Sequence, residues 1–398
     1  MNRTILKSNS AFVAIGQSPS WTTGNDSGRL FSLVQNCNFS VNNERQKLKQ
    51  IGSQNYAVND LIRAPNIELS FDYYLSPYIS NELAMNFQQK SAANIGAFYN
   101  MKSTNNNFYI VIDPEDFRDA FEQPKNPIIT NSSYSGFNVL SFGNCYLNKY
   151  SVSFNLNEIP KVSVGFEASN MKFDVLTGNS ITIPAINSVS GNSLNAGSLN
   201  LSGFYSSLTG NFITGLSNNK TEYDPPVVIP SYCTFSLQNL QVGGVDLSTQ
   251  SKPILQNLSL NFDLPRTPLY GLGSNYVYNR KLEYPINGSV NLSAQVSGFS
   301  SGFLSGMLYN ESGYNFDISF SEPSKFATGF YSITNARLDN FNYSIAVNDI
   351  LNFTAEFSVE VNDSTGFYID RKTVKTPLLW SAISNLWSGI NVTWQSLE

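Results

Sequence analysis

The sequence contains few side chains that could carry out chemistry. None of its 398 residues is histidine, the residue on which acid–base catalysis near neutral pH and most zinc sites depend. Without histidine, no serine or cysteine has the partner that most often activates a nucleophile. We therefore expect a protein that is not an enzyme and that holds no metal or cofactor.

Other candidate motifs fit structural roles better than chemical ones. The acidic pairs at 115–116 and 360/363 suit a helix N-terminus and a solvated strand. The glycine-rich segments 242–245 and 271–273 lack the lysine of a phosphate-binding loop, so turns or bulges explain them. Scattered Asp and Asn oxygens could bind calcium, but the spacing of an EF-hand is missing.

The cysteines and the lengths of the apolar runs limit the classes of protein to which the chain can belong. Cys37, Cys145 and Cys233 are an odd number at wide spacings, and none belongs to a CxxC pair. Buried thiols explain them best, and one disulfide with a spare cysteine stays open as the alternative. The N-terminal stretch lacks the apolar core of a signal peptide, and no run approaches about 18 apolar residues. We expect no insertion into a membrane.

Composition favours a folded, strand-rich chain with covered surfaces. Apolar residues make up 41% and aromatic residues 13%, and aromatic and β-branched side chains favour strands. Charged residues make up only 13%, about half the usual share, and charge is depleted at interface cores. The net charge of −5, with no long Lys/Arg cluster, argues against a protein that reads nucleic-acid sequence.

An internal repeat divides the chain. The segment 34–53 aligns without gaps to 255–274, at a constant offset of 221, and six of the aligned positions are identical. The segment 144–168 aligns to 335–359, at an offset of 191, again with six identities. Two blocks in the same order, with matching apolar alternation, predict two copies of one domain.

Differences between the copies set the expected boundaries. The first offset exceeds the second by 30, so the first copy carries an insertion near 76–138. A polar, Gly/Ser-rich stretch at 187–207 and the proline pair after Asp224 separate the copies. We predict domains at 1–222 and 223–398.

The aligned blocks predict β-hairpins. In 151–168 and 343–360, apolar and polar residues alternate around a short turn, which gives each strand one apolar and one polar face. The other hairpin has a long connection, at 43–65 in the first copy and 263–285 in the second. Charge is concentrated there, and connections longer than about 15 residues are uncommon unless they have a function.

Helix signals are few. Asp113 and Pro114 suit the start of a helix over 113–122, with the apolar residues on one face. Weaker signals lie at 81–89 and 380–387. The expected fold is mainly β.

An open hairpin with a long charged loop, a short helix and a tight hairpin together resemble the tail tube protein of long-tailed phages and related tube systems such as type VI secretion. The resemblance is a pattern and covers most of the first copy and both hairpins of the second. The residues that carry it are 50–53, 60–65, 67–74, 145–147 and 160–171.

The resemblance implies a fold and an assembly. It implies two tandem tail-tube-like β-sandwich or half-barrel domains, each with a short helix. In that family six tube domains form a ring, inner strands line a channel, and a long loop contacts the next ring. Where two domains are fused, three chains give a pseudo-hexamer. This chain would then be a virion tail protein, made in the host cytoplasm.

The resemblance also implies partners and residues. The partners would be further copies of the chain and other tail proteins such as the tape measure, terminator and baseplate. DNA would pass through without specific binding, since an acidic face without basic patches does not hold phosphate. The expected inter-ring loop contacts are Arg45, Lys47, Lys49, Asp60, Arg63, Arg266, Arg280 and Lys281. The expected channel residues are Glu158, Glu167, Glu356 and Glu360.

Two other classes share the strand pattern. One is a different virion or surface β-protein, such as a capsid decoration, a spike, or a receptor- or glycan-binding protein. The other is an outer-membrane barrel, which has the same alternation but a more regular strand spacing. Oligomeric form separates the first class from a tube, because a tube subunit forms a stacked filament.

Overall fold

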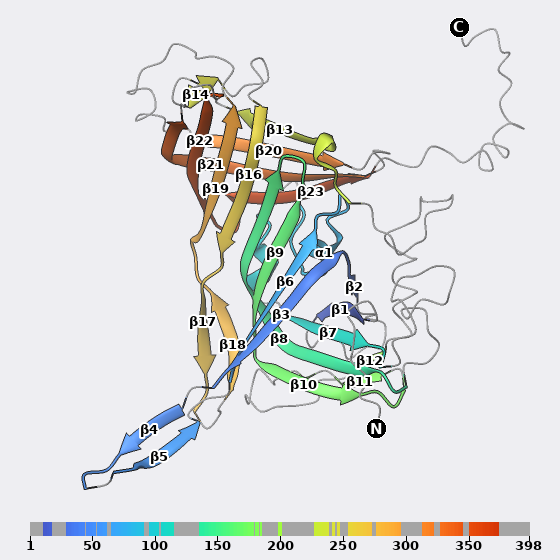
Figure 1. Cartoon of the computed structure of the whole chain (residues 1–398), viewed down its shortest axis with the longest axis vertical. Coiled ribbons are helices and arrows are strands. Elements are labelled where there is room, and N and C mark those ends of the chain that lie inside the picture. Colours follow the sequence, from blue (N-terminus) through green and yellow to red (C-terminus); the bar gives the residue numbers. More distant parts are fainter. Residues whose placement is uncertain are drawn as a thin grey trace, which may run out of the picture.

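A computed structural model shows the arrangement of the chain (Figure 1). The structure describes residues 11–17, 29–43, 45–52, 54–61, 65–90, 95–102, 105–114, 135–178, 180–182, 184, 198–200, 227–238, 241–242, 245–246, 254–272, 276–295, 313–321, 327–344 and 350–373.

The first half is built almost entirely from strands. Its helical elements are α1 (Ser80–Ala84) and the 3-10 turn η2 (Tyr99–Lys102). Its strands are β1 (Ala11–Gln17), β2 (Arg29–Phe31), β3 (Val34–Asn42), β4 (Arg45–Lys49), β5 (Tyr56–Leu61), β6 (Asn66–Tyr74), β7 (Asn106–Ile112), β8 (Asn138–Asn155), β9 (Lys161–Ala168), β10 (Asn170–Val175), β11 (Ser180–Thr182) and β12 (Ser198–Asn200).

The second half is also built almost entirely from strands. It begins with the 3-10 turn η5 (Pro230–Tyr232). Its strands are β13 (Cys233–Gln238), β14 (Gln241–Val242), β15 (Val245–Asp246), β16 (Ile254–Asp263), β17 (Arg266–Tyr270), β18 (Val277–Leu282), β19 (Ile286–Gln295), β20 (Tyr314–Ser321), β21 (Ala327–Ser344), β22 (Asn352–Val361) and β23 (Phe367–Thr373). The prediction of a mainly β fold is confirmed.

The helix predictions have mixed outcomes. The signal at 81–89 corresponds to α1, which is shorter because Asn86 adopts a left-handed φ of 70° just beyond it. Of the helix expected at 113–122, the described residues include only Asp113 and Pro114. The helix expected at 380–387 and the boundary near 223 lie outside the described residues. The helices of the described part are too short to cross a bilayer.

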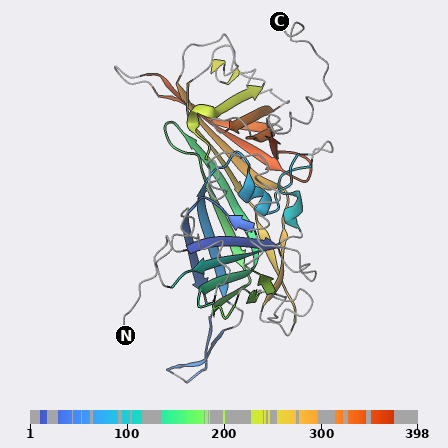
Figure 2. The same ribbon diagram turned by 90° about the vertical axis from the view of Figure 1, so that its right-hand side faces the viewer.

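One antiparallel sheet runs through both halves. Its strands follow the order β3-β6-β9-β8-β16-β19-β22-β21, and we call this the shared sheet. The two halves meet where β8 pairs with β16, from Asn155 opposite Asn257 to Lys149 opposite Asp263. Figure 2 shows the molecule from the side, elongated along the direction in which the halves follow one another.

A second layer covers the apolar side of the shared sheet. β8 and β21 are each 18 residues long, and their N-terminal parts belong to this outer layer. There β8 pairs with β7 and β10, and β21 pairs with β20 and β23. Both long strands carry an asparagine with positive φ, Asn144 and Asn335, whose backbone N–H donates to the side chain of Asn107 or Asn315.

The pairing pattern of the first half recurs in the second. Bulges interrupt equivalent ladders at positions that differ by the offsets 221 and 191 found in the sequence. These bulges lie at Val34/Asn36 and Leu255/Asn257, at Leu48/Lys49 and Leu269/Tyr270, and at Leu147/Lys149 and Leu338/Asn340.

Strand pairing relates β7 of the first half to β20 of the second. Asn106 of β7 pairs with Cys145, and Tyr314 of β20 pairs with Ala336, so β7 corresponds to β20. The offset from Asn106 to Tyr314 lies between 221 and 191. Under the internal repeat, the additional residues would stand on both sides of β7, within the range 76–138 predicted from the sequence.

A segment between β6 and β7 joins the halves, and we call residues 86–90 and 95–102 the junction segment. The backbone N–H groups of Lys90 and Ala97 donate to the carbonyls of Ile369 and Phe367, at 2.7 and 2.9 Å. Phe98 is buried, and its ring lies 5.5 Å from those of Phe262 and Phe367. The first half thus covers the free edge of β23.

Candidate functional site

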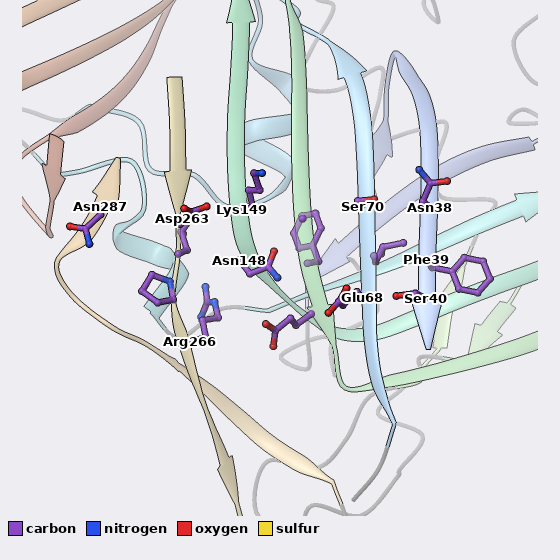
Figure 3. A pocket seen from close by; sticks show the side chains of 16 residues that line it. Asn38, Phe39, Ser40, Glu68, Ser70, Asn148, Lys149, Asp263, Arg266 and Asn287 are labelled. Atoms are coloured by element: carbon purple, nitrogen blue, oxygen red, sulfur yellow. The ribbon is translucent and has the colours of Figure 1, made fainter. Parts of the chain in front are cut away.

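One side of the shared sheet is polar across all its strands. Period-two alternation sends side chains such as Phe71, Phe166 and Phe357 into the core and their neighbours outward. Figure 3 shows part of this polar face, a shallow depression of about 710 Å³. Its polar lining comes from both halves and includes Asn38, Ser40, Glu68, Ser70, Asn148, Lys149, Asp263 and Asn287.

Acidic groups outnumber basic ones on the polar face. Lys161 pairs with Asp72 at 3.1 Å. Burial opposes ionisation of Asp72, but hydrogen bonds from Ser163 and Lys161 outweigh it and lower the pKa of this carboxyl. Glu356 and Glu360 on β22 are exposed on the same face. A face of this kind repels a phosphate backbone.

The four expected channel residues lie in three settings. Glu356 and Glu360 lie on the open polar face. Glu158 lies in the β8–β9 turn at the margin of the sheet, where the Asn155 side chain donates to it at 2.7 Å. Glu167 forms an ion pair with Arg280 of the second half. The structure thus brings together two residues that the sequence placed in separate sites.

The two long connections are β-hairpins, β4–β5 and β17–β18. β3 and β16 run in the same direction because four antiparallel pairings separate them. Both hairpins therefore leave the same end of the shared sheet, the lower end in Figure 1.

The predicted loop residues on β4 fit an outward-facing role. Arg45, Lys47 and Lys49 are exposed, and the Lys47 ammonium lies 5.6 Å from the centre of the Tyr56 ring. Lys281 on β18 is also exposed. Asp60 lies on β5, but its side chain is outside the described part, as is the whole of Arg63.

Arg266 is instead used within the chain. Its guanidinium donates to the carbonyls of Leu147, Arg280 and Met101 at 2.7, 3.1 and 3.1 Å. It also lies 5.4 Å from the centre of the Tyr146 ring. Burial lowers its pKa to about 10. The side chain holds the base of β17–β18 against the first half, so Arg266, predicted as an inter-ring loop contact, makes these contacts within the chain.

Arg280 is also internal. Its side chain is buried, donates to Glu167 and donates to the Asn66 side chain at 3.2 Å. Both acceptors belong to the first half. A buried guanidinium needs such acceptors, because leaving it unpaired is costly. Arg280, predicted as an inter-ring contact, thus fastens the second hairpin to the first half, as Arg266 does.

Exposed apolar residues mark the two ends of the sheet. Ile51 and Leu272, at the hairpin tips, are fully exposed. Ile159 and Ile350, beside the turns at the opposite end, are 43% and 55% exposed. Each pair is related by one of the two offsets of the internal repeat. Only charged residues of the long loops were predicted as contacts, whereas an apolar residue that recurs at matching positions is the sequence signal for these exposed ends.

A buried carboxylate lies between the halves. Glu82 of α1 accepts from the hydroxyls of Tyr73 and Tyr150, at 2.8 and 3.3 Å. The Tyr150 hydroxyl lies 2.9 Å from that of Tyr331 in the second half. Burial raises the pKa of Glu82, while hydrogen bonds from these tyrosines oppose the rise.

This cluster predicts a pH-dependent stability. A raised pKa in the fold means that the contribution of Glu82 is complete below its ordinary value of 4.5 and is lost as pH rises through the folded value. Glu82→Gln should remove that loss, so the difference in free energy of unfolding between variant and wild type should grow in favour of the variant from pH 4 to 8. Urea unfolding across this range measures it, and parallel curves would contradict the assignment.

The three cysteines are free thiols. Cys145 is buried, and Cys37 and Cys233 are partly buried. Burial raises the pKa of Cys37 and of Cys233 to about 12, which keeps both thiols protonated and unreactive near neutral pH.

Comparison with known proteins gives distant structural similarities, which include a phage tail tube and a phage-like baseplate. No family model and no curated protein matches the chain. The SPP1 tail tube shares 11% identity, with 44% of this chain and 82% of that chain covered and a TM-score of 0.29. The anti-feeding prophage baseplate shares 15% identity, with 36% and 92% covered and a TM-score of 0.22. At scores this low, function is better inferred from the surfaces of the chain itself.

Proposed function

We propose that this chain is a structural, non-enzymatic virion protein, the subunit of a phage tail tube. Three copies form a ring of six similar domains, and rings stack around a channel for DNA. The single observation that carries the proposal is the β8–β16 pairing, which joins two similar halves edge to edge within one chain.

The same junction can form between copies. By the recurring registers, β3 corresponds to β16 and β21 corresponds to β8. In the described part, β3 pairs only with β6, and the C-terminal part of β21 pairs only with β22. Each therefore presents an open edge, which proteins normally cover. Pairing β21 of one copy with β3 of the next is a heterologous contact, which closes into a ring when the rotation permits.

The polar face and the two ends of the shared sheet suit the channel wall and the contacts between stacked rings. The polar face of the shared sheet supplies a channel wall with an acidic excess, which does not retain DNA. The apolar hairpin tips and the apolar turns lie at opposite ends of the sheet, so stacked rings would bring one set against the other. Burial of these exposed side chains favours stacking.

The proposed junction has a defined register. Within the chain, Asn261 lies opposite Ser151. The equivalent pair between copies is Ser40 opposite Asn342. Residues directly opposite in an antiparallel pair have Cβ atoms about 4.5–5.5 Å apart, close enough for an engineered disulfide with slight adjustment.

Cross-linking tests the ring. With Cys37 and Cys233 replaced by serine, Ser40→Cys/Asn342→Cys should give oxidised dimers and trimers on denaturing gels and nothing larger. Asn38→Cys/Asn342→Cys is the matched control, because its diagonal Cβ atoms are about 7–8 Å apart and should cross-link weakly.

Electron microscopy of the wild-type chain at rising concentration tests the tube. Hollow tubes or stacked rings are expected. Equal cross-linking of the two cysteine pairs would contradict the register. Discrete particles that never stack would contradict the tube and favour a capsid decoration or a receptor-binding protein.

A further inference from the structure

We propose that the first half carries a seat for the second half of a neighbouring copy, formed by Phe39, Val41, Arg45 and Phe173. The inference rests on the proposed ring and identifies the side chains that hold it together. Edge pairing alone would involve only backbone groups of β3 and β21, whereas the seat extends across the outer layer to β10.

The apolar members of the seat are exposed where their counterparts are buried. Phe39 is 44% exposed, Val41 40% and Phe173 67%. By the offset of the first repeat block, the counterparts of Phe39 and Val41 are Leu260 and Phe262, and both are 0% exposed.

The counterpart of Phe173 follows from strand pairing. Phe173 lies opposite Leu140 on β8, and Ile369 lies opposite Tyr331 on β21. Tyr331 is the counterpart of Leu140 by the offset of the second repeat block. Ile369 is 0% exposed, so the two equivalent positions differ completely in burial.

The first half buries these counterparts. Leu260 lies opposite Val152 of β8. Phe262 packs against Phe98 of the junction segment, and the carbonyl of Ile369 accepts from the N–H of Lys90. Within one chain, the first half therefore covers this apolar surface of the second half. The first half has apolar residues at the equivalent positions. In the described part of the chain, these residues stay exposed.

The occupant that fits is a second copy of this chain. Phe341 and Tyr343 of β21 correspond to Tyr150 and Val152 of β8, which cover the counterpart surface. They are apolar and half-buried, and they lie on the strand whose open edge faces the seat. A neighbour arriving through β21 therefore brings an apolar surface to Phe39 and Val41.

Arg45 gives the seat a polar anchor. Arg45 and Arg266 occupy the same place in their hairpins, opposite Leu61 and Leu282 respectively. The Arg266 guanidinium donates to the Leu147 carbonyl, and Leu338 is the counterpart of Leu147. Arg45 is exposed on β4, and we assign it the Leu338 carbonyl of the next copy. Under this assignment, Arg45 contacts a neighbouring copy in the same ring. The tips of the hairpins, farther along the same strands, contact the next ring.

The paired arginines provide the test. Arg45→Ala should raise the concentration needed for assembly by roughly tenfold or more, and it should lower the melting temperature of the unassembled chain less than Arg266→Ala does, because Arg45 is exposed. Arg266→Ala should lower that melting temperature, because its contacts lie within the chain. Sedimentation and thermal unfolding measure the two effects.

A second variant pair tests the apolar part. Phe173→Asp should prevent assembly, because it would place a charge in a buried contact, and Phe173→Leu should assemble like the wild type. If Arg45→Ala and Phe173→Asp assemble at the wild-type concentration, the seat is refuted while the ring stands. If the wild-type chain never assembles, the ring fails and the seat fails with it.

Discussion

Phe98→Ala is expected to lower the free energy of unfolding by about 3–5 kcal/mol, the usual cost of removing a fully buried phenylalanine. Phe98 is 1% exposed and belongs to the junction segment. Its ring contacts Phe87 of the same segment at 5.3 Å and Phe262 and Phe367 of the second half at 5.5 Å. The cavity would therefore open between the halves, where relaxation would also weaken the β8–β16 junction.

Urea unfolding followed by circular dichroism measures this loss. The matched control is Tyr99→Ala, since Tyr99 is the next residue and is 43% exposed. That variant should lose about 1 kcal/mol or less, including its contact with the Lys102 ammonium. Equal losses for Phe98 and Tyr99 would show that the junction segment does not hold the halves together.

Glu167→Ala is expected to cost about 3 kcal/mol, because it leaves the Arg280 guanidinium charged and buried with Asn66 as its remaining side-chain acceptor. Glu167 belongs to the first half and Arg280 to the second, so the loss again falls on the contact between them. Much of the cost comes from the stranded charge, since the Glu167 side chain is itself 25% exposed.

Two controls separate this pair from general effects of charge. Glu167→Gln keeps an acceptor for Arg280 and should lose less than the alanine variant. Glu356→Ala removes an exposed carboxylate from the same polar face and should change the free energy of unfolding by about 0.5 kcal/mol or less. A loss for Glu167→Ala as small as that for Glu356→Ala would mean that the pair contributes little.

The two predictions locate stability at one place, the contact between halves. Side chains from separate elements of the first half, Tyr73, Glu82, Tyr150 and Phe98, lie there with Tyr331 and Phe367 of the second. The positions equivalent to Tyr73 and Tyr150 in the second half are Ala294 and Phe341, which carry no hydroxyl. Under the proposed ring, contacts between copies would therefore be more apolar than the contact within a chain.

The sequence alone determined the orientation of several strands and the equivalence of strands between the halves. Period-two alternation in 161–168 and 353–360 specified which side chains face the core, because a strand with one buried face tolerates only one register. The two offsets of the internal repeat specified the equivalent strands, and the same offsets recur in the bulges. Low charge and the lack of histidine predict a protein without catalytic chemistry.

Tertiary structure decided which equivalent residues are buried. Arg45 and Arg266 stand at aligned positions of the internal repeat and have equivalent hairpin pairings, yet only Arg266 contacts Leu147 and Met101, 119 and 165 residues away. No local pattern encodes such contacts, because they depend on what packs beside the hairpin. Arg266 has the first half of its own chain beside it, whereas Arg45 is exposed at the outer edge of that half, where the proposed ring would place another copy.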